Sequence, residues 1–463
     1  MYNTIVEGRD HMENNVSDQL FWDELQTLAT NEQIESFREK FLDMHPYDQA
    51  VFFIEQVREI RLHIYTYLSP EETANIMEHV ELDDIKPLFT EMDPRFAAMV
   101  LAEMATDDAV DILNELGKDV VVSLLTIMDD KNAADIKELL HYEEKTAGSI
   151  MTTEFVAIYQ SKTVNDTMQY LKAEAPEAET IYYLYVIDED KRLVGVVSLR
   201  DLIVAEPDIQ VADLMNENVL FVSVARDQED VAQMIRDYDF LALPVVDFQR
   251  HLLGIITVDD ILDVMDEEAS DDYSKLAGVS DMERPQDSAL ISTKKRLPWL
   301  IILLFLGILT ASLIGQFEEA LEQVAVLAIF IPLLAGMAGN TGTQALAVAV
   351  RGLSTGDYGK QGKMKLMVRE AATGLINGLV CGTLLTTIVY FWQDDFFLGL
   401  LVGLSIMATL VIATLAGAFV PILMDRLKID PAVASGPFIT TINDIISILI
   451  YFGLATAFMQ YLV

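Results

Sequence analysis

Long apolar stretches recur after residue 297 and predict membrane-spanning helices. They cover residues 297–315, 324–338, 371–392, 396–424 and about 432–461. Most approach the roughly 20 apolar residues that a helix needs to cross the hydrocarbon core. The second is short unless it continues through the polar segment up to residue 350, which can lie at depth only against protein or water. The pattern therefore predicts five spans, of which the fourth is long enough to be tilted or bent.

The first 145 residues show a different pattern, with short amphipathic segments and no strand signal. Segments of this kind cover residues 93–104, 106–116, 117–128 and 131–140. Their Leu, Met, Val and Ile positions fit one buried face of a helix, and Asp or Thr near the starts are suitable caps. The spacing predicts an all-α domain over residues 1–145, built as a small superhelix of stacked hairpins.

An internal repeat lies between these two regions. Residues 186–203, "VIDEDKRLVGVVSLRDLI", align without gaps on residues 245–262, "VVDFQRHLLGIITVDDIL", with an offset of 59. The pattern in each copy predicts a strand, a turn, a second strand and a capped helix. A helical pattern precedes each copy. We expect a duplicated α/β domain over residues 146–268, a connecting helix over 269–296 and a five-helix membrane domain over 297–463.

Charge is distributed unevenly along the chain. The net charge is −42, and the ten Lys/Arg and ten Asp/Glu from residue 294 onward cancel, so the whole excess lies in residues 1–293. Such an acidic surface repels nucleic acid, which requires a basic face, and it indicates cations as partners. Solubility alone is the alternative explanation.

The basic residues of the membrane half indicate its orientation. All ten lie before the first span, between the second and third, or between the fourth and fifth. The charged residues of the opposite loops are all acidic. The positive-inside rule then places the N-terminal domains in the cytoplasm and the C-terminus outside the cell membrane. The polar N-terminus lacks a secretory signal, and the single cysteine, Cys381, excludes a disulfide framework.

Asp444 lies inside the last predicted span, with apolar residues on both sides and no Lys or Arg in that span. A carboxylate at such depth is costly and indicates a cation or proton pathway. The polar stretch "PLLAGMAGNTGTQ" (332–344) contains Asn340, Thr341 and Gln344. Its small residues suit tight helix packing, and its amides and hydroxyls suit a pore lining.

An acidic helix is predicted after the second repeat. Asp260, Asp263, Glu267 and Asp271 are spaced i, i+3, i+7 and i+11 and share one helix face. Their mutual repulsion destabilises a helix, and a divalent cation with oxygen ligands relieves it. A solvated acidic face is the alternative, as it is for Asp107 and Asp111 in the N-terminal domain.

The duplicated segments resemble a tandem pair of CBS domains. Such pairs often bind adenine nucleotides, with an Asp on the ribose and a basic residue facing phosphate. The first copy keeps this signature as Ser198, Arg200 and Asp201, whereas the second has Asp259 where the basic residue is expected. The resemblance implies at most one nucleotide site per chain, and a pair that binds no nucleotide is the alternative.

The order of the domains, together with "EEKTAGSIMT" (143–152), "GMAGNTGTQ" (336–344) and "IDPAVASGPFITTINDI" (429–445), resembles the MgtE family of magnesium channels. The resemblance implies a homodimer in the lipid membrane, with Asp444 binding hydrated Mg²⁺ in a pore at the dimer axis and Asp430 near the inner mouth. It implies regulatory Mg²⁺ on Glu229, Asp239, Asp260, Asp263, Glu268, Asp271 and Asp272, with Asp107 and Asp111 contributed by the helical domain. It implies ATP contacts at Tyr183, Arg200, Asp201 and Phe240.

The mechanism implied by the resemblance joins the two halves. High cytoplasmic Mg²⁺ bridges the acidic surfaces and holds the pore closed, and falling Mg²⁺ lets the charged domains repel one another. Two alternatives remain open, namely a carrier coupled to Na⁺ or H⁺ and a non-conducting Mg²⁺ sensor. An intramembrane metalloprotease is disfavoured because no histidine follows residue 251, and we expect no enzymatic activity.

Overall fold

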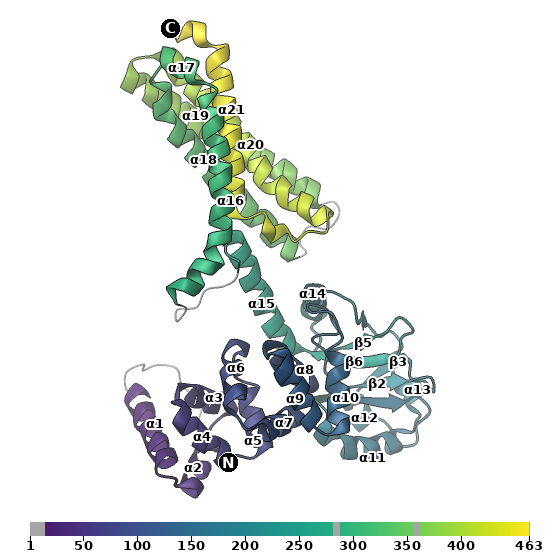
Figure 1. Ribbon diagram of the computed structural model, residues 1–463. Coiled ribbons are helices and arrows are strands. Elements are labelled where there is room, and N and C mark those ends of the chain that lie inside the picture. Colours follow the sequence, from purple (N-terminus) through teal and green to yellow (C-terminus); the bar gives the residue numbers. More distant parts are fainter. Residues whose placement is uncertain (1–13, 281–287, 356–361, 463) are drawn as a thin grey trace. The chain divides into compact units, whose positions relative to one another are not determined.

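The computed structural model describes residues 14–280, 288–355 and 362–462 (Figure 1). Contacts between residues divide the chain into two units, one up to Ile261 and the other from Leu262 onward. Each unit is considered separately below.

The N-terminal part of the first unit is entirely helical over the described residues 14–139. Its helices are α1 (Asn14–Thr30), α2 (Ile34–Phe41), α3 (Pro46–Glu55), α4 (Arg58–Tyr67), α5 (Pro70–Met77), α6 (Leu82–Glu91), α7 (Pro94–Glu103), α8 (Thr106–Glu115), α9 (Lys118–Ile127) and α10 (Asp130–Leu139). From α5 to α10 each helix packs on the helix two places along the chain, which buries one apolar face per helix. Proline opens α3, α5 and α7, where its fixed φ suits the first turn. The expected all-α superhelical domain is confirmed.

Two three-stranded sheets follow, one from each repeat. The first repeat contains β1 (Phe155–Tyr159), α11 (Val164–Glu174), η1 (Ala175–Glu177), β2 (Thr180–Ile187), β3 (Leu193–Ser198), α12 (Leu199–Val204) and α13 (Val211–Leu214). The second contains β4 (Val222–Ser223), α14 (Gln228–Tyr238), β5 (Ala242–Val246), β6 (Leu252–Thr257) and α15 (Val258–Ala277). In each sheet the first pair of strands is parallel and the second pair is antiparallel.

The strand register reproduces the sequence repeat. Tyr183 lies opposite Ser198 in the first sheet, and Ala242 lies opposite Thr257 in the second, so both partners are shifted by 59 residues. The copies are also joined, because Thr152 before β1 exchanges two backbone hydrogen bonds with Ile255 of β6, at 2.8 and 3.0 Å. The duplicated α/β pair is confirmed.

The second unit contains five helices of more than 20 residues within its described part. They are α16 (Ala289–Gly315), α18 (Leu327–Ser354), α19 (Gly362–Gln393), α20 (Phe396–Arg426) and α21 (Gly436–Ala457), with the short helices α17 (Glu318–Gln323), η2 (Pro431–Val433) and η3 (Met459–Tyr461) between or after them. Four are long and apolar enough to cross a membrane, namely α16, α19, α20 and α21. The fifth, α18, has 28 residues but contains the polar stretch up to Gln344.

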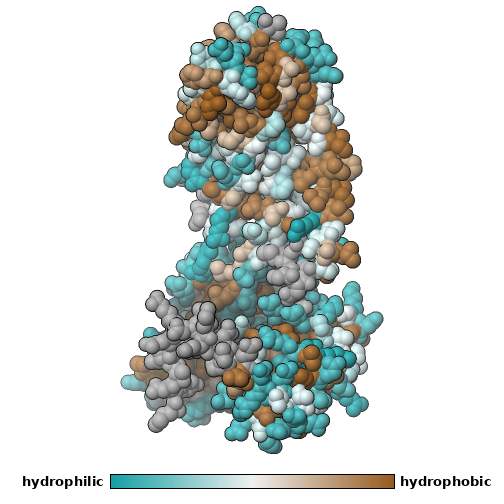
Figure 2. Space-filling model, turned by 90° about the vertical axis from the view of Figure 1, so that its left-hand side faces the viewer, coloured by the Kyte–Doolittle hydropathy of each residue, from teal (hydrophilic) through white to brown (hydrophobic). Residues whose placement is uncertain are grey.

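Hydrophobic side chains cover much of the surface of this helical unit, whereas hydrophilic side chains dominate the surface of the N-terminal unit (Figure 2). In α16 no residue is buried within one chain. An exposed apolar helix surface of this kind is expected to face lipid or another protein chain.

The segment expected as a connecting helix, 269–296, contains the ends of two different helices. α15 ends at Ala277, and Gly278 follows with φ of +73°. A left-handed residue at this position terminates a helix. α16 begins at Ala289 and runs without interruption through the first predicted span, to Gly315.

Candidate cation-binding sites and pore

A cluster of carboxylates gathers where the helical domain meets the CBS-like pair. Asp107 and Asp108 lie in the first turn of α8, and Asp260 lies in the first turn of α15. Asp107 is only 7% exposed, and its Oδ1 atom has no hydrogen-bond partner among the described residues. A buried, unpartnered carboxylate oxygen is unfavourable unless a proton or a cation neutralises it.

Electrostatics confirm that these carboxylates affect one another. Burial, followed by the charge of Asp260, raises the pKa of Asp107 well above its usual range. Burial and the neighbouring carboxylates Glu78 and Asp260 raise the pKa of Asp108 to about 8. Burial and the neighbouring carboxylates, Asp260 foremost among them, raise the pKa of Glu179 to about 7.

Local structure positions these groups. Thr257 precedes α15 and donates its hydroxyl to Asp260 Oδ2 at 2.5 Å, which orients that carboxylate. The start of α8 has no side-chain cap of its own at Ala105. Glu154, from the segment before β1, accepts hydrogen bonds there from the Thr106 hydroxyl and, at 3.4 Å, from the Thr106 amide. The CBS-like pair thus supplies the missing cap of the helix that bears Asp107.

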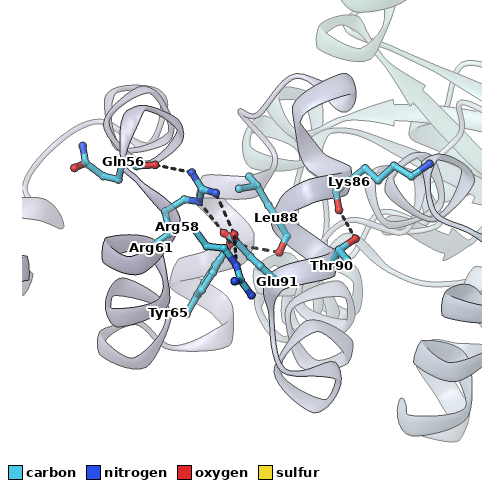
Figure 3. Close-up of polar contacts among 8 residues, drawn as sticks. All are labelled: Gln56, Arg58, Arg61, Tyr65, Lys86, Leu88, Thr90 and Glu91. Atoms are coloured by element: carbon cyan, nitrogen blue, oxygen red, sulfur yellow. Dashed lines mark hydrogen bonds and ion pairs between the residues drawn. The ribbon is translucent and has the colours of Figure 1, made fainter.

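Not every buried carboxylate of the helical domain is available to a cation. Glu91 of α6 has a side chain that is 5% exposed, and Arg61 of α4 binds it through two hydrogen bonds, at 2.7 and 3.0 Å (Figure 3). Tyr65 donates a further hydrogen bond at 3.1 Å, and Arg58 lies 3.6 Å away. Glu91 is therefore saturated by protein groups, in contrast to Asp107.

A second group of carboxylates lies in the membrane unit, where the end of α15 meets the segment between α20 and α21. Asp430 caps η2 by accepting the Ala432 amide at 2.8 Å. Lys275 binds Asp430 at 2.5 Å and Asp271 at 2.9 Å. Asp272 accepts the hydroxyl of Ser354, at the end of α18, at 2.7 Å. Three of the predicted ligands are thus brought together.

The charge states in this group are perturbed as well. Burial raises the pKa of Asp272, and Asp430 raises it further, although the bond from Ser354 opposes the shift. Burial lowers the pKa of Lys275, but the hydrogen bonds to Asp430 and Asp271 outweigh it, so the net shift is upward. Lys275 is therefore an ammonium at physiological pH.

The remaining predicted ligands occupy other positions. Asp111 is one turn after Asp107 in α8, and its charge contributes to the raised pKa of Asp108. Asp263 and Glu268 lie in the middle of α15. Glu229 is in the first turn of α14, and Asp239 is its left-handed C-cap, both exposed. Among the described residues, no three His, Cys, Asp or Glu side chains converge closely enough to hold an ion directly. Hydrated Mg²⁺ fits this arrangement, since it binds protein through few direct contacts and keeps its water.

The polar part of α18 packs against α21 near Asp444. A Cβ atom on Gly342 would lie 1.9 Å from Asn443 Nδ2, so only glycine permits this approach. Thr343 and Thr440 hydroxyls lie 3.3 Å apart across the same contact. Asp444 is half-buried, and among the described residues no hydrogen bond to its side chain is found.

Two of the three predicted pore residues lie on another face of α18. Thr341 and Gln344 line a cavity of about 370 Å³ together with Glu370 and Asn377 of α19. Thr341 is buried and Gln344 is exposed. Asn340 is exposed and does not line this cavity.

The predicted nucleotide contacts cluster in the first repeat. Ser198 caps α12, accepting the Asp201 amide at 3.1 Å and donating to Asp201 Oδ2 at 2.6 Å. Tyr183 lies opposite Ser198 on the neighbouring strand, and Arg200 is exposed. Phe240 belongs to the second repeat, where it stacks on Tyr238 at 5.6 Å between ring centroids.

Several site residues were not predicted from the sequence. Asp108, Glu154 and Glu179 belong to the first carboxylate cluster, and Lys275 belongs to the second. The doubled acid "TDDAVD" was a signal for Asp108. Glu154 and Glu179 lie in irregular segments on either side of β1 and α11, where spacing carries no information about proximity.

The fold and the sites together define a class of protein, a multi-pass helical membrane protein with a CBS pair and an acidic helical domain. Family models match the divalent cation transporter MgtE at residues 331–454, the MgtE intracellular N domain at 44–145 and CBS domains at 147–208 and 211–267. The chain is 53% identical to the magnesium transporter MgtE of Enterococcus faecalis, over 95% of this chain and 97% of the relative. It is 42% identical to MgtE of Bacillus subtilis, over 94% and 96%. The chain belongs to the MgtE family.

Solved structures agree with this assignment. The soluble part of a magnesium transporter is 51% identical and matches with a TM-score of 0.52, over 54% of this chain and 99% of that structure. The cytosolic domain of the Mg²⁺ channel MgtE in complex with ATP is 38% identical, with a TM-score of 0.51 over 52% and 99%.

Proposed function

We propose that the protein carries Mg²⁺ into the cytoplasm through a pore between two copies of the chain, and that cytoplasmic Mg²⁺ closes this pore. The observation that carries the transport proposal is the position of Asp444 in the apolar helix α21, beside the polar and glycine-rich part of α18. A lone carboxylate at this depth is stable when it faces water or a cation. The names of the full-length relatives, all magnesium transporters, support the same ion.

In this proposal Asp444 holds Mg²⁺ through its hydration shell, because Mg²⁺ loses water reluctantly. Two copies facing one axis give two carboxylates, and Asp430 adds charge near the inner mouth. Asn340 is the predicted lining residue that stays exposed in the single chain, whereas Thr341 and Gln344 contribute through the cavity beside α19. The inside-negative potential drives entry with roughly 2.3 kcal/mol per charge for each 100 mV.

The orientation and domain roles follow from charge. The basic flanks support an orientation with the N-terminal domains and the CBS pair in the cytoplasm and the C-terminus outside. Residues 1–145 and 146–268 then form the sensor, 269–296 connects it to the membrane, and 297–463 form the pore domain of a homodimer in lipid. The exposed apolar surface of α16 supports contact with lipid or with the second copy.

Regulation by Mg²⁺ is supported by the carboxylates that repel one another in the absence of a cation. Asp107 of α8 and Asp260 of α15 come from different domains, and the charge of Asp260 contributes to the raised pKa of Asp107. Bound Mg²⁺ would remove this repulsion and hold the helical domain on the CBS pair. In this proposal further ions bind at the predicted ligands Asp263, Glu268, Asp271, Asp272, Glu229 and Asp239.

A nucleotide site in the first CBS repeat completes the proposal. Ser198 holds the Asp201 carboxylate by a hydrogen bond, Tyr183 pairs with Ser198 on the neighbouring strand, and Arg200 is exposed, where it can meet a phosphate. The related cytosolic domain solved with ATP supports this assignment.

Asp201→Asn is expected to abolish ATP-dependent thermal stabilisation, and Asp213→Asn, elsewhere in the same repeat, is the control.

The transport proposal is tested by Mg²⁺ uptake into liposomes that contain the full-length protein. Asp444→Asn keeps the shape of the side chain and removes its charge, so uptake is expected to fall at least about tenfold if the charge stabilises the ion by about 1.4 kcal/mol or more. Asp394→Asn is the matched control, because residue 394 has φ of +53°, which Asn tolerates. Normal uptake by a folded Asp444→Asn protein would contradict the proposal, and dependence on a Na⁺ or pH gradient would identify a carrier.

A further inference from the structure

Lys275 is the only basic residue of α15, which contains eight acidic residues. Its ammonium does not extend into solvent. It lies between two carboxylates from different elements, 2.9 Å from Asp271 of α15 and 2.5 Å from Asp430 before η2. Asp272, the neighbour of Asp271, is held by Ser354 on the same side of the unit.

This is the position that a cation binding to Asp271 and Asp430 would require. A divalent ion and the ammonium cannot both occupy the space between two carboxylates, because each would have to displace the other's ligands. We propose that Lys275 is a tethered cation that holds the inner-mouth carboxylates until a divalent cation displaces it, and that it thereby excludes monovalent cations from this site.

The tether explains the selectivity. The ammonium of Lys275 is attached by a short flexible tether, so its effective concentration beside the Asp271 and Asp430 carboxylates is in the millimolar range or above. K⁺ or Na⁺ carries the same single charge and gains little by replacing it. A divalent cation brings twice the charge and therefore competes successfully.

The exposure of these side chains allows the displaced ammonium to reach solvent. The Lys275 side chain is 30% exposed, and Asp430 and Asp271 are 37% and 29% exposed. The flexible four-carbon stem lets the ammonium swing into water while α15 stays in place. The hydrogen bond from Ser354 to Asp272 does not involve Lys275, so displacement of the ammonium leaves it intact.

The inference rests on the proposed Mg²⁺ sensing and assigns to Lys275 the role of setting the threshold at this site. It is tested with the full-length protein in detergent, by measuring thermal stabilisation as a function of Mg²⁺ at low and high KCl. Lys275→Met keeps most of the stem and removes the charge. It is expected to lower the Mg²⁺ midpoint by about two- to fivefold, the range expected for partly exposed ion pairs. High KCl is expected to raise the midpoint again in the variant more than in the wild type.

Two controls separate this role from general stability. Lys363→Met breaks another Lys–Asp pair of the membrane unit, with Asp425, and is expected to leave the Mg²⁺ midpoint unchanged. Lys275→Arg keeps the charge and is expected to behave as the wild type. Once Asp430→Asn has removed one partner, Lys275→Met is expected to lower the midpoint less, since the two residues act on each other.

A midpoint that is unchanged or raised in Lys275→Met overturns the inference, because the bridge would then be neutral or would itself hold the Mg²⁺-bound form. Equal shifts with and without Asp430 overturn it as well. If the wild type shows no Mg²⁺ response, the proposed sensing fails along with the inference. A normal wild-type response with an unaltered Lys275→Met response contradicts the inference alone.

Discussion

At the scale of single residues, the difference between a saturated and an unsaturated carboxylate separates structural from functional acids. Glu91 and Asp107 are both buried in the same helical domain. Glu91 has Arg61 and Tyr65 as partners, whereas one oxygen of Asp107 has none among the described residues. Burial alone therefore does not distinguish a candidate cation ligand, and the proposed role of Asp107 rests on its unpartnered oxygen as well.

Replacing Arg61 with Leu leaves the buried Glu91 carboxylate with the Tyr65 hydroxyl and, 3.6 Å away, the exposed Arg58 as its remaining partners. We expect the free energy of unfolding of the segment before α16 to fall by about 3 kcal/mol, because breaking a buried pair leaves an uncompensated charge. Arg58→Leu is the control, since that side chain is 64% exposed and its loss is expected to cost under about 1 kcal/mol. Chemical denaturation measures both, and equal losses would contradict the assignment.

The unsaturated acids predict a pH dependence without divalent cations. The pKa values of Asp108 and Glu179 are raised to about 8 and about 7. A carboxyl group with a raised pKa stabilises the docked domains at low pH, and this contribution disappears as the pH rises through those values. The melting temperature in EDTA is expected to fall between about pH 5 and pH 8.

Magnesium is expected to flatten this pH dependence by taking the place of the protons. The double variant with Asp108→Asn and Glu179→Gln is expected to show a smaller decrease of melting temperature with pH in EDTA than the wild type, and Asp107, whose pKa is also raised, accounts for the decrease that remains. An undiminished slope in that variant would show that other groups cause the pH dependence.

At the scale of helices, close backbone approach arranges the membrane unit. A Cβ atom on Gly417 of α20 would lie 2.2 Å from the Gly342 carbonyl oxygen of α18. Gly342 in turn admits Asn443 of α21, the residue before Asp444. Three helices are thus held together around one point, and the position of the intramembrane carboxylate depends on it.

Gly417→Ala is expected to lower the melting temperature in detergent, because overpacking a close contact costs about 1–3 kcal/mol. Backbone atoms cannot yield as a flexible side chain does. Gly453→Ala, in α21, is the control, since no atom lies within 4 Å of its added Cβ. Equal melting temperatures for the two variants would mean that the close contact between α18 and α20 does not contribute to stability.

At the scale of the whole molecule, the charge asymmetry matters most. The entire −42 lies before residue 294, and the membrane half is neutral. Self-repulsion of that size destabilises a compact arrangement, whereas divalent cations bound between carboxylates oppose it. Under the proposed regulation, the same surface would favour different arrangements at low and at high Mg²⁺.

The radius of gyration of the segment before α16 is expected to decrease when Mg²⁺ is added, as measured by small-angle X-ray scattering. NaCl at equal ionic strength is expected to produce a smaller decrease, because screening weakens repulsion without bridging carboxylates. Neutralising Asp107 and Asp260 with Asn is expected to reduce the response to Mg²⁺. Equal compaction by both salts would favour screening over specific binding.

Much of this organisation could be predicted from local patterns. The 59-residue offset anticipated the register that pairs Tyr183 with Ser198 and Ala242 with Thr257, because a duplicated pattern of apolar residues specifies a duplicated sheet. Short helical segments were predicted nearly to the residue, since capping and periodicity act locally. The lack of basic residues near Asp444 could also be read directly from the chain.

Contacts between distant segments could not be predicted in this way. Asp260 raises the pKa of Glu179 only because tertiary folding brings them together, and Lys275 reaches Asp430 across 155 residues. The neighbours of each face of α18 could not be predicted from the sequence either. The period of 3.6 residues separates Thr341 from Thr343, but it does not say which neighbouring helix each one meets.

The cap that Glu154 provides for α8 has a consequence for how the protein responds over time. While the domains are docked, the first turn of α8 has an acceptor for its free amide. After separation this turn has no side-chain cap and is expected to fray, so that Asp107 loses the fixed orientation it needs. Rebinding would then require the turn to refold first, and backbone amides of that turn would exchange hydrogen with solvent only in the separated state. Sensing in this protein would then include the folding of one helix end. Folding of that turn would couple domain docking to Mg²⁺ binding, so the response would be cooperative without any further site.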